Sequence, residues 1–310
     1  MNKKNIFLGI LLCVISTLAF GGQWPVAESA LKVIDPFYFT LIRYVAVAIV
    51  LSIILLLVEG KKGFIINKKK NFLSLWFFGT MAFTAYNFLV FTGQKMLGVS
   101  GSIIGSVLMA LIPFAAILTL WVYKKKKPAI LTIICMFIGL IGVLLVITNG
   151  NFNYFMLNES AILPIILMLL SVFAWVIYTI GIGNFKGWSP LKYTTLSCIL
   201  GNISSVIVII ILNFTGYITA PTFSQVYSVL PQMTYMIFIS GVIGVLTWNA
   251  GNKKIGATYG SFFMNLIPIV TLIISVIQGY KVGIIEILGA SLTIIVLILN
   301  NLYKIKAQNN

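Results

Sequence analysis

The chain consists of apolar segments of roughly 20 residues, separated by short polar or charged stretches. One helix of that length crosses the hydrocarbon core of a bilayer. With 60% hydrophobic and 8% charged residues, a chain of 310 residues cannot cover its apolar surface with polar side chains in water. The sequence therefore predicts an all-α membrane protein that is solvated by lipid and has no detached soluble domain.

Ten such segments can be drawn, and each is expected to form one transmembrane helix. Lys3 and Lys4 before the first segment resemble the start of a signal peptide, but a cleavable signal has a short apolar region. The first apolar run reaches at least Phe20 and continues after Trp24, so we interpret it as a retained helix. The expected spans are Ile6–Leu31, Phe37–Val58, Phe72–Thr92, Leu97–Tyr123, Pro128–Ile147, Ala161–Ile182, Leu191–Phe214, Met233–Ala250, Ala257–Ile277 and Ile284–Leu302.

The lysines predict the orientation, because cytoplasmic loops carry an excess of Lys and Arg. With the N terminus inside, ten helices also bring the C terminus inside, and only Lys32, Lys95 and Lys281 then fall outside. We therefore expect a multi-pass protein of the cytoplasmic (inner) membrane with both termini in the cytoplasm. The lysines expected inside are Lys3, Lys4, Lys61, Lys62, Lys68–Lys70, Lys124–Lys127, Lys186, Lys192, Lys253, Lys254, Lys304 and Lys306.

The net charge of +16 is spread over these short loops. A nucleic-acid-binding protein gathers its basic residues on one soluble face, so we expect the lipid bilayer, and not nucleic acid, to be the partner of the lysines. Cys13, Cys135 and Cys198 lie in separate apolar spans, and the chain contains no histidine. A disulfide framework, a metal site, histidine-based catalysis and a cofactor are therefore not expected.

The fourth and ninth expected helices carry the same pattern of residues at a spacing of 155. Glycines four apart allow close backbone approach between membrane helices, and an interior proline bends a helix. Since the spacing is half the chain, we expect a duplication, with one repeat over residues 1–150 and a second over 158–305. The matched pairs are Gly101/Gly256, Gly105/Gly260, Ser106/Ser261, Met109/Met264, Leu111/Leu266, Ile112/Ile267 and Pro113/Pro268.

Five helices per repeat is an odd number, so the second repeat must cross the membrane in the opposite sense to the first. Inverted repeats are typical of secondary transporters, whose substrate site lies near the bilayer midplane between the repeats. The sequence thus predicts ten helices arranged as two inverted five-helix repeats around a central site.

Several stretches of the chain resemble a known family. Asp35-Pro36 followed by Leu41-Ile42-Arg43, the Gly-Ala-Thr-Tyr-Gly-Ser run from Gly256, and Gly289-Ala290-Ser291-Leu292 are similar to the EamA branch of the drug/metabolite transporter superfamily. The resemblance covers nearly the whole chain and implies an inner-membrane permease, often an exporter of amino acids or other metabolites, with a cavity between two five-helix halves. The glutamate that the family often carries before its fifth and tenth helices is missing here, which weakens assignment to any subgroup.

The five acidic residues constrain the mechanism. On the expected topology Glu59 is inside and the other four lie at or near the outer surface, so no carboxylate lies at mid-membrane. Proton-coupled exporters of cationic drugs use a buried acid that binds a proton and a cation in turn, and only Glu28 could fill that role here. A cation-coupled multidrug exporter is therefore the alternative transport mode.

Arg43 is the one basic residue well inside an expected span, two turns below the outer end of the second helix at about 1.5 Å per residue. Intramembrane ionisable residues are functional candidates by default. In one interpretation, Arg43 is the counter-ion of a carboxylate-bearing substrate. In the other, its side chain extends outward to the interface or pairs with Asp35 or Glu28.

Uncharged polar and aromatic residues inside the spans are the remaining candidates for the wall of the site, because their polar groups cannot face lipid cheaply. Trp24 and Trp248 lie near expected helix ends and have the alternative role of interface anchors. Pro25, Pro113 and Pro268 are the expected hinges. The candidate substrate-binding residues are Trp24, Arg43, Tyr86, Asn87, Ser106, Trp175, Tyr178, Trp248, Asn249 and Asn265.

These observations favour a secondary carrier that exports small metabolites such as amino acids by alternating access, as a monomer or a homodimer. The sequence has no phosphate-binding Gly-x-x-x-x-Gly-Lys loop, so direct driving by ATP is not expected. A membrane-embedded enzyme would need a clustered nucleophile, an acid pair or a metal set, and a receptor would need a sizeable soluble domain. The sequence carries neither pattern, so we predict no catalytic residue.

Overall fold

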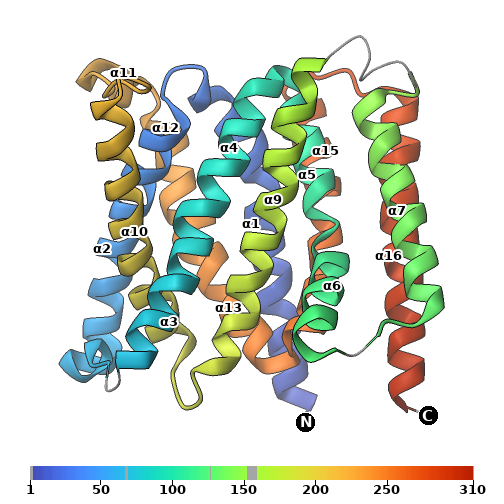
Figure 1. The fold of residues 1–310 in the computed structure, drawn as a ribbon, viewed down its shortest axis with the longest axis horizontal. Coiled ribbons are helices and arrows are strands. Elements are labelled where there is room, and N and C mark those ends of the chain that lie inside the picture. Colours follow the sequence, from blue (N-terminus) through green and yellow to red (C-terminus); the bar gives the residue numbers. More distant parts are fainter. Residues whose placement is uncertain (1–2, 67–68, 126, 152–158, 310) are drawn as a thin grey trace.

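The computed structural model describes residues 3–66, 69–125, 127–151 and 159–309, and these parts of the chain are helical, without a strand (Figure 1). Within them, seven helical runs are long and apolar enough to cross a membrane, and a further span is a pair of helices bent by 46°. Two shorter apolar helices, Phe263–Ile277 and Ile284–Asn300, complete a set of ten. The chain is an all-α membrane protein, as the sequence predicts.

Each half of the described chain contributes five spans. Those of the first half are α1 (Lys3–Leu31), α2 (Pro36–Glu59), the run of α3 (Lys69–Gly79), η2 (Thr80–Ala85) and α4 (Tyr86–Leu97), the pair α5 (Gly101–Met109) and α6 (Ile112–Lys124), and α7 (Ile130–Thr148). Those of the second half are α9 (Ile162–Gly181), α10 (Pro190–Phe214), the run of α12 (Leu230–Thr234), η6 (Tyr235–Gly244) and α13 (Val245–Ile255), the run of α14 (Ala257–Gly260), η7 (Ser261–Asn265) and α15 (Leu266–Ile277), and α16 (Ile284–Asn309). Short helical turns, η1 (Gly60–Phe64), η3 (Gly98–Ser100), η4 (Glu159–Ala161), η5 (Ile182–Asn184) and α11 (Phe223–Ser228), connect them.

The third and eighth spans end later than apolarity alone predicts. Their helices continue to Leu97 and Ile255, and the fourth span begins only at Gly101. Each helix ends where a glycine takes a positive φ, 61° at Gly98 and 88° at Gly256. Other residues rarely adopt that conformation, so the glycines, and not the last apolar residues, set these boundaries.

The second helix of each repeat begins in the same way. The Asp35 side chain accepts a hydrogen bond from the backbone N–H of Phe37 at 2.9 Å, and the Ser189 hydroxyl accepts one from Lys192 at 2.9 Å. A proline follows each cap inside the first turn. The caps satisfy N–H groups that have no partner within the helix, and proline fits the first turn without losing a bond.

The two repeats run in opposite directions through the molecule (Figure 1). α1 leaves the end of the bundle that holds both termini, whereas α9 begins at the opposite end and runs back. The connections from α2 to α3, from α6 to α7 and from α9 to α10 lie at the terminal end and carry several lysines. Lys32 and Lys281 belong to connections at the other end, and Lys95 lies in the last turn of α4 at that end. Lys68 and Lys126, which are expected on the cytoplasmic side, lie outside the described residues.

Both repeats contain a π-helical segment at the same position. η2 begins at Thr80 and η6 at Tyr235, which are 155 residues apart, the spacing of the sequence repeat. A π-helical turn widens the helix and is frequent at functional sites. The internal symmetry therefore extends to an irregularity that the sequence does not reveal.

The fourth and ninth spans are both interrupted before their prolines. α5 and α6 meet at Ala110 and Leu111, just before Pro113, and η7 changes from 3₁₀ to α-helix at Leu266, just before Pro268. Proline has no N–H for the preceding turn and its ring crowds that carbonyl. α1 packs against α13, α15 and η6 of the second repeat, while α7 and α16 pair with each other at one side of the bundle (Figure 1).

Candidate functional site

A narrow cavity lies between the repeats. Three of its lining pairs are 155 residues apart: Phe20 with Trp175, Met109 with Met264, and Ile112 with Ile267. The rings of Phe20 and Trp175 meet edge to face with centroids 5.6 Å apart. The side chains leave room for roughly one water molecule, so the cavity has no substrate-sized space in this structure. Its lining is Phe20, Gln23, Tyr44, Tyr86, Met109, Ile112, Trp175, Met264 and Ile267.

Arg43 lies directly behind this lining and is 1% exposed. Its Nε donates to the Met236 carbonyl at 2.9 Å, and its Nη2 contacts Ser240 Oγ at 2.8 Å and Gln23 Oε1 at 3.3 Å. The Ser240 hydroxyl donates in turn to Gln23 Oε1 at 2.7 Å. Met236 and Ser240 belong to η6, so the π-helical segment of the second repeat holds the arginine of the first.

The guanidinium has no carboxylate partner among the described residues, where the one ion pair joins Lys32 to Glu28. Its Nη1 makes no hydrogen bond, and the group lies over the Tyr44 ring, 4.6 Å from the centroid. The expected alternative, an Arg43 that extends outward or pairs with Asp35 or Glu28, is wrong. Asp35 caps α2 instead, and Glu28 contacts Ser102.

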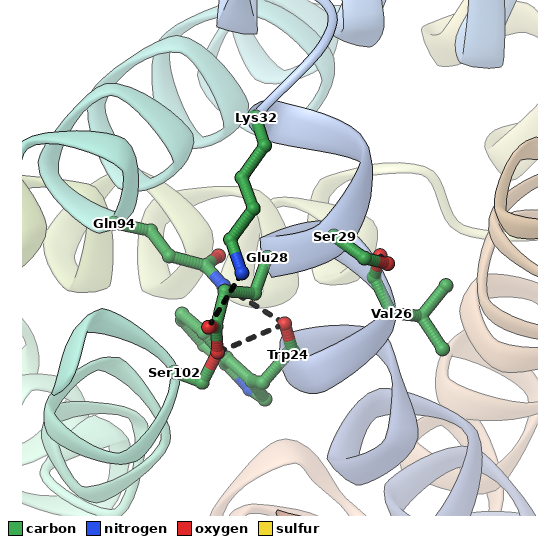
Figure 2. Close-up of polar contacts among 7 residues, drawn as sticks. All are labelled: Trp24, Val26, Glu28, Ser29, Lys32, Gln94 and Ser102. Atoms are coloured by element: carbon green, nitrogen blue, oxygen red, sulfur yellow. Dashed lines mark hydrogen bonds and ion pairs between the residues drawn. The ribbon is translucent and has the colours of Figure 1, made fainter. Parts of the chain in front are cut away.

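A polar cluster joins α1, α4 and α5 (Figure 2), near the ends of these helices that lie opposite the chain termini (Figure 1). Ser102 Oγ lies 2.7 Å from Glu28 Oε2 and 3.1 Å from the Trp24 carbonyl. Gln94 Nε2 donates to the same carbonyl at 2.8 Å and to Ser102 Oγ at 3.1 Å. Lys32 reaches Glu28 at 3.6 Å. We call Glu28, Gln94 and Ser102 the α1–α4–α5 cluster, because it ties these three helices together.

A second polar cluster lies within the other repeat, on the part of α13 that is nearer the end of the bundle with the chain termini. Asn249 Nδ2 donates to Tyr178 Oη at 2.7 Å and to Thr194 Oγ1 at 2.8 Å. Trp248 Nε1 donates to Thr179 Oγ1 at 3.2 Å. This α9–α10–α13 cluster is the counterpart of the first, because Asn249 follows Gln94 by 155 residues. One buried amide in each repeat therefore joins three helices, at opposite ends of the cavity.

The remaining candidate residues have different surroundings. Trp24 and Trp248 are both 0% exposed, so their alternative role as interface anchors is wrong. Trp24 packs where a side chain at Gly105 would collide with its ring, which explains one glycine of the repeated pattern. Ser106 donates to the Ile103 carbonyl of its own helix at 2.8 Å.

The candidate amides Asn87 and Asn265 are both buried but differ in their hydrogen bonds. Asn87 Nδ2 donates at 2.7 Å to the Ala82 carbonyl of the π-helical turn η2. Asn265 is 4% exposed, and neither atom of its amide has a partner among the described residues. Asn265 immediately follows Met264, which lines the cavity.

The three expected hinges lie at the repeat interface or at breaks in spans. Pro25 deprives the Gly21 carbonyl of its helical donor, and Thr271 of α15 donates to that oxygen at 2.8 Å. Pro113 and Pro268 follow the interruptions of the fourth and ninth spans. At Pro25, the hydrogen bond from Thr271 of α15 to α1 thus replaces the backbone hydrogen bond that the proline removes.

Tyr280 lies in the turn before α16, and its pKa is perturbed. Tyr280 Oη donates to Glu286 Oε1 at 3.0 Å. Burial, together with the negative charge of Glu286, raises the pKa of Tyr280 above its ordinary value. Tyr280 therefore stays neutral and available as a donor to Glu286 through the physiological pH range.

Sequence reasoning missed Gln23, Gln94, Ser102 and Ser240. Gln23 and Gln94 carry the signal that identified Asn87, an amide inside an apolar segment, and could have been found by it. Serines give no such signal, because they are common in membrane helices. Among the described residues, no three His, Cys, Asp or Glu side chains come together as a metal site requires.

Comparison with known proteins supplies a family for this architecture. The EamA-like transporter family matches residues 7–148 and 162–302. The chain is 40% identical, over 99% of its length and 95% of the relative's, to uncharacterized transporter YrdR of Bacillus subtilis (strain 168). It is 29% identical, over 95% of its length and 93% of the relative's, to uncharacterized transporter YyaM of the same organism. A solved crystal structure matches 97% of this chain and 96% of its own with a TM-score of 0.67 at 14% identity, a likeness of fold alone.

Proposed function

The chain belongs to the EamA-like transporter family, and on that premise we propose that it is a secondary carrier that exports small metabolites, such as amino acids, by alternating access. It is a multi-pass membrane transporter. In this proposal it lies in the cytoplasmic membrane with both termini inside, and it works as a monomer or a homodimer. Repeats over residues 1–150 and 158–305 form its two moving halves; residue 158 lies outside the described residues.

One observation carries the proposal: the central cavity is lined by equivalent residues of two inverted repeats. In carriers with inverted repeats, one half rocks against the other around a fixed site, so that the site opens to each side in turn. The contact of Phe20 with Trp175 lies at the centre of such a motion and would be preserved while the ends of the bundle open.

The two amide clusters support the same mechanism. The α1–α4–α5 cluster lies at one end of the cavity and the α9–α10–α13 cluster at the other. Opening one end requires its cluster to loosen while the other stays intact. Pro25, Pro113 and Pro268 are the hinges in this proposal, because their spans have a missing backbone bond at which to bend.

A cation-coupled multidrug exporter remains the alternative mode, and the surroundings of the cavity do not favour it. The charged side chain directly behind the lining is Arg43, which repels a cation. Glu28, the acid that such a mechanism would use, contacts Ser102 and Lys32 at one end of the bundle.

Purified protein in liposomes tests the proposal. We expect loaded amino acids to leave protein-containing liposomes faster than liposomes without protein, and cells that produce the protein to resist toxic amino-acid analogues. Arg43→Ala is the control that should remove both effects. Hydrolysis of the solutes, or their binding without flux across the membrane, would contradict a carrier.

A further inference from the structure

The orientation of the Gln23 amide is fixed by its neighbours. Gln23 Oε1 faces Arg43 Nη2 at 3.3 Å and Ser240 Oγ at 2.7 Å. A guanidinium has donors only, so it can contact the oxygen end of an amide but not the NH₂ end. Because Gln23 also lines the cavity, its Nε2 is the end that faces Tyr86, a side-chain hydrogen-bond partner of Gln23, and the NH₂ group keeps a second N–H for a ligand.

Among the described residues, no opposite charge is paired with Arg43 behind Gln23. Arg43 is 1% exposed, its Nη1 has no hydrogen-bond partner, and no carboxylate pairs with it among the described residues. A buried charge in an apolar surround is costly unless an opposite charge or strong acceptors compensate it. Arg43 also polarises Gln23 through their contact, which makes the Nε2 hydrogens better donors.

We propose that the central cavity recognises the carboxylate of its substrate, with Gln23 Nε2 as the direct donor and Arg43 as the compensating charge behind it. The inference rests on the proposed carrier function and narrows it to substrates with a carboxylate, whether simple organic acids or amino acids. Gln23 is then the residue that touches the substrate, and Arg43 positions and polarises it through the contact at Oε1. A cation without a carboxylate is excluded by the same charge.

The test compares carboxylates with other ions on purified full-length protein. Thermal unfolding is followed in sodium acetate, propanoate or butanoate, against sodium chloride and ethylammonium chloride at equal ionic strength. We expect at least one carboxylate to raise the unfolding temperature of the wild type by about 2 °C or more over chloride, because a ligand that binds only the folded state stabilises it. Ethylammonium should not do so.

Gln23→Glu is the decisive variant, because it places a carboxylate of the protein's own within reach of Arg43. We expect it to raise the unfolding temperature in chloride and to abolish the carboxylate response. Gln278→Glu makes the same change at an exposed loop position and should keep the response. If Gln23→Glu does not fold, Gln23→Leu removes the donor without adding charge and should also abolish the response.

Three outcomes would overturn the inference: no carboxylate response in the wild type, an equal response to ethylammonium, or a full response in Gln23→Glu. Flux measurements separate this failure from failure of the carrier function. Liposome export of neutral or cationic metabolites, without any carboxylate response, would leave the proposed function standing and remove the carboxylate site. Absence of all flux would contradict the proposed function itself.

Discussion

Buried amides in the described part of the bundle separate into those with partners and two without, Asn265 and Asn300. Asn87 donates to the Ala82 carbonyl in the π-helical turn, whereas both atoms of Asn265 lack partners among the described residues. A hydrogen-bonded amide stabilises the fold, whereas a buried amide without a partner loses its hydration free energy and gains no hydrogen bond. The two side chains therefore make opposite predictions when each is replaced by leucine.

Asn87→Leu should lower the free energy of unfolding by about 1–2 kcal/mol, because it leaves the Ala82 carbonyl without its donor. Asn265→Leu should leave stability unchanged or raise it, and it should reduce transport if the amide serves the substrate. Chemical denaturation in detergent and flux in liposomes measure the two effects. Unchanged transport kinetics in a folded Asn265→Leu variant would remove this residue from the site.

Ser102 makes a separate prediction at the end of the cavity. Ser102→Ala removes the hydroxyl between Glu28 and the Trp24 carbonyl (Figure 2) and should lower the free energy of unfolding by about 1 kcal/mol. The loosened cluster should also open this end more often, so a thiol reagent should reach a cysteine placed at buried Leu31, beside the cluster, faster. Ser29→Ala is the matched control, since Ser29 is exposed and bonds only within α1. Equal effects of the two substitutions would contradict a closing role for Ser102.

Helices of the two repeats approach each other closely at glycines. Gly79 of α3 and Gly201 of α10 lie so close that a Cβ on either would collide with the backbone of the other helix. The contact lies immediately before η2, so the crossing of α3 and α10 also sets where the π-helical segment packs. Small residues at such crossings are the usual means by which membrane helices approach.

Gly79→Ala should therefore destabilise the protein by about 3 kcal/mol, because neither the Ser197 carbonyl nor the helix that carries it can shift easily. Gly183→Ala is the control, since a Cβ there meets nothing within 4 Å. It should change the free energy of unfolding by about 0.5 kcal/mol at most. Thermal unfolding of the two variants measures the difference, and similar stabilities would show that α3 and α10 are free to separate.

For the whole molecule, the features that the sequence predicts are those set by segment length, charge and spacing. The ten spans and their inverted duplication follow from apolar runs and from pairs such as Met109 and Met264. The partners of Arg43 do not follow, because Gln23 lies 20 positions away and Ser240 lies 197 away in the other repeat. Contacts of this kind depend on how helices rotate and bend, and the π-helical segments that decide this leave no pattern in the residues.

The orientation in the membrane can be tested directly, because the lysines gather at the terminal end of the bundle. Cys13, Cys135 and Cys198 are buried, so they should react little with a labelling reagent, and they can also be replaced by alanine. A cysteine at exposed Lys61, between α2 and α3, should react with a membrane-impermeant maleimide only in inside-out vesicles. A cysteine at exposed Gly216, after α10, should react in intact cells.

The expectation behind this experiment is that basic loops stay on the cytoplasmic side, since Lys and Arg near helix ends resist translocation. Labelling of position 61 in intact cells and of position 216 only after inversion would reverse the topology. The α1–α4–α5 cluster would then face the cytoplasm, and export would have to begin at that end rather than at the α9–α10–α13 cluster. The two labelling sites therefore decide which amide cluster closes the carrier against the outside, and hence the order in which the two ends must open.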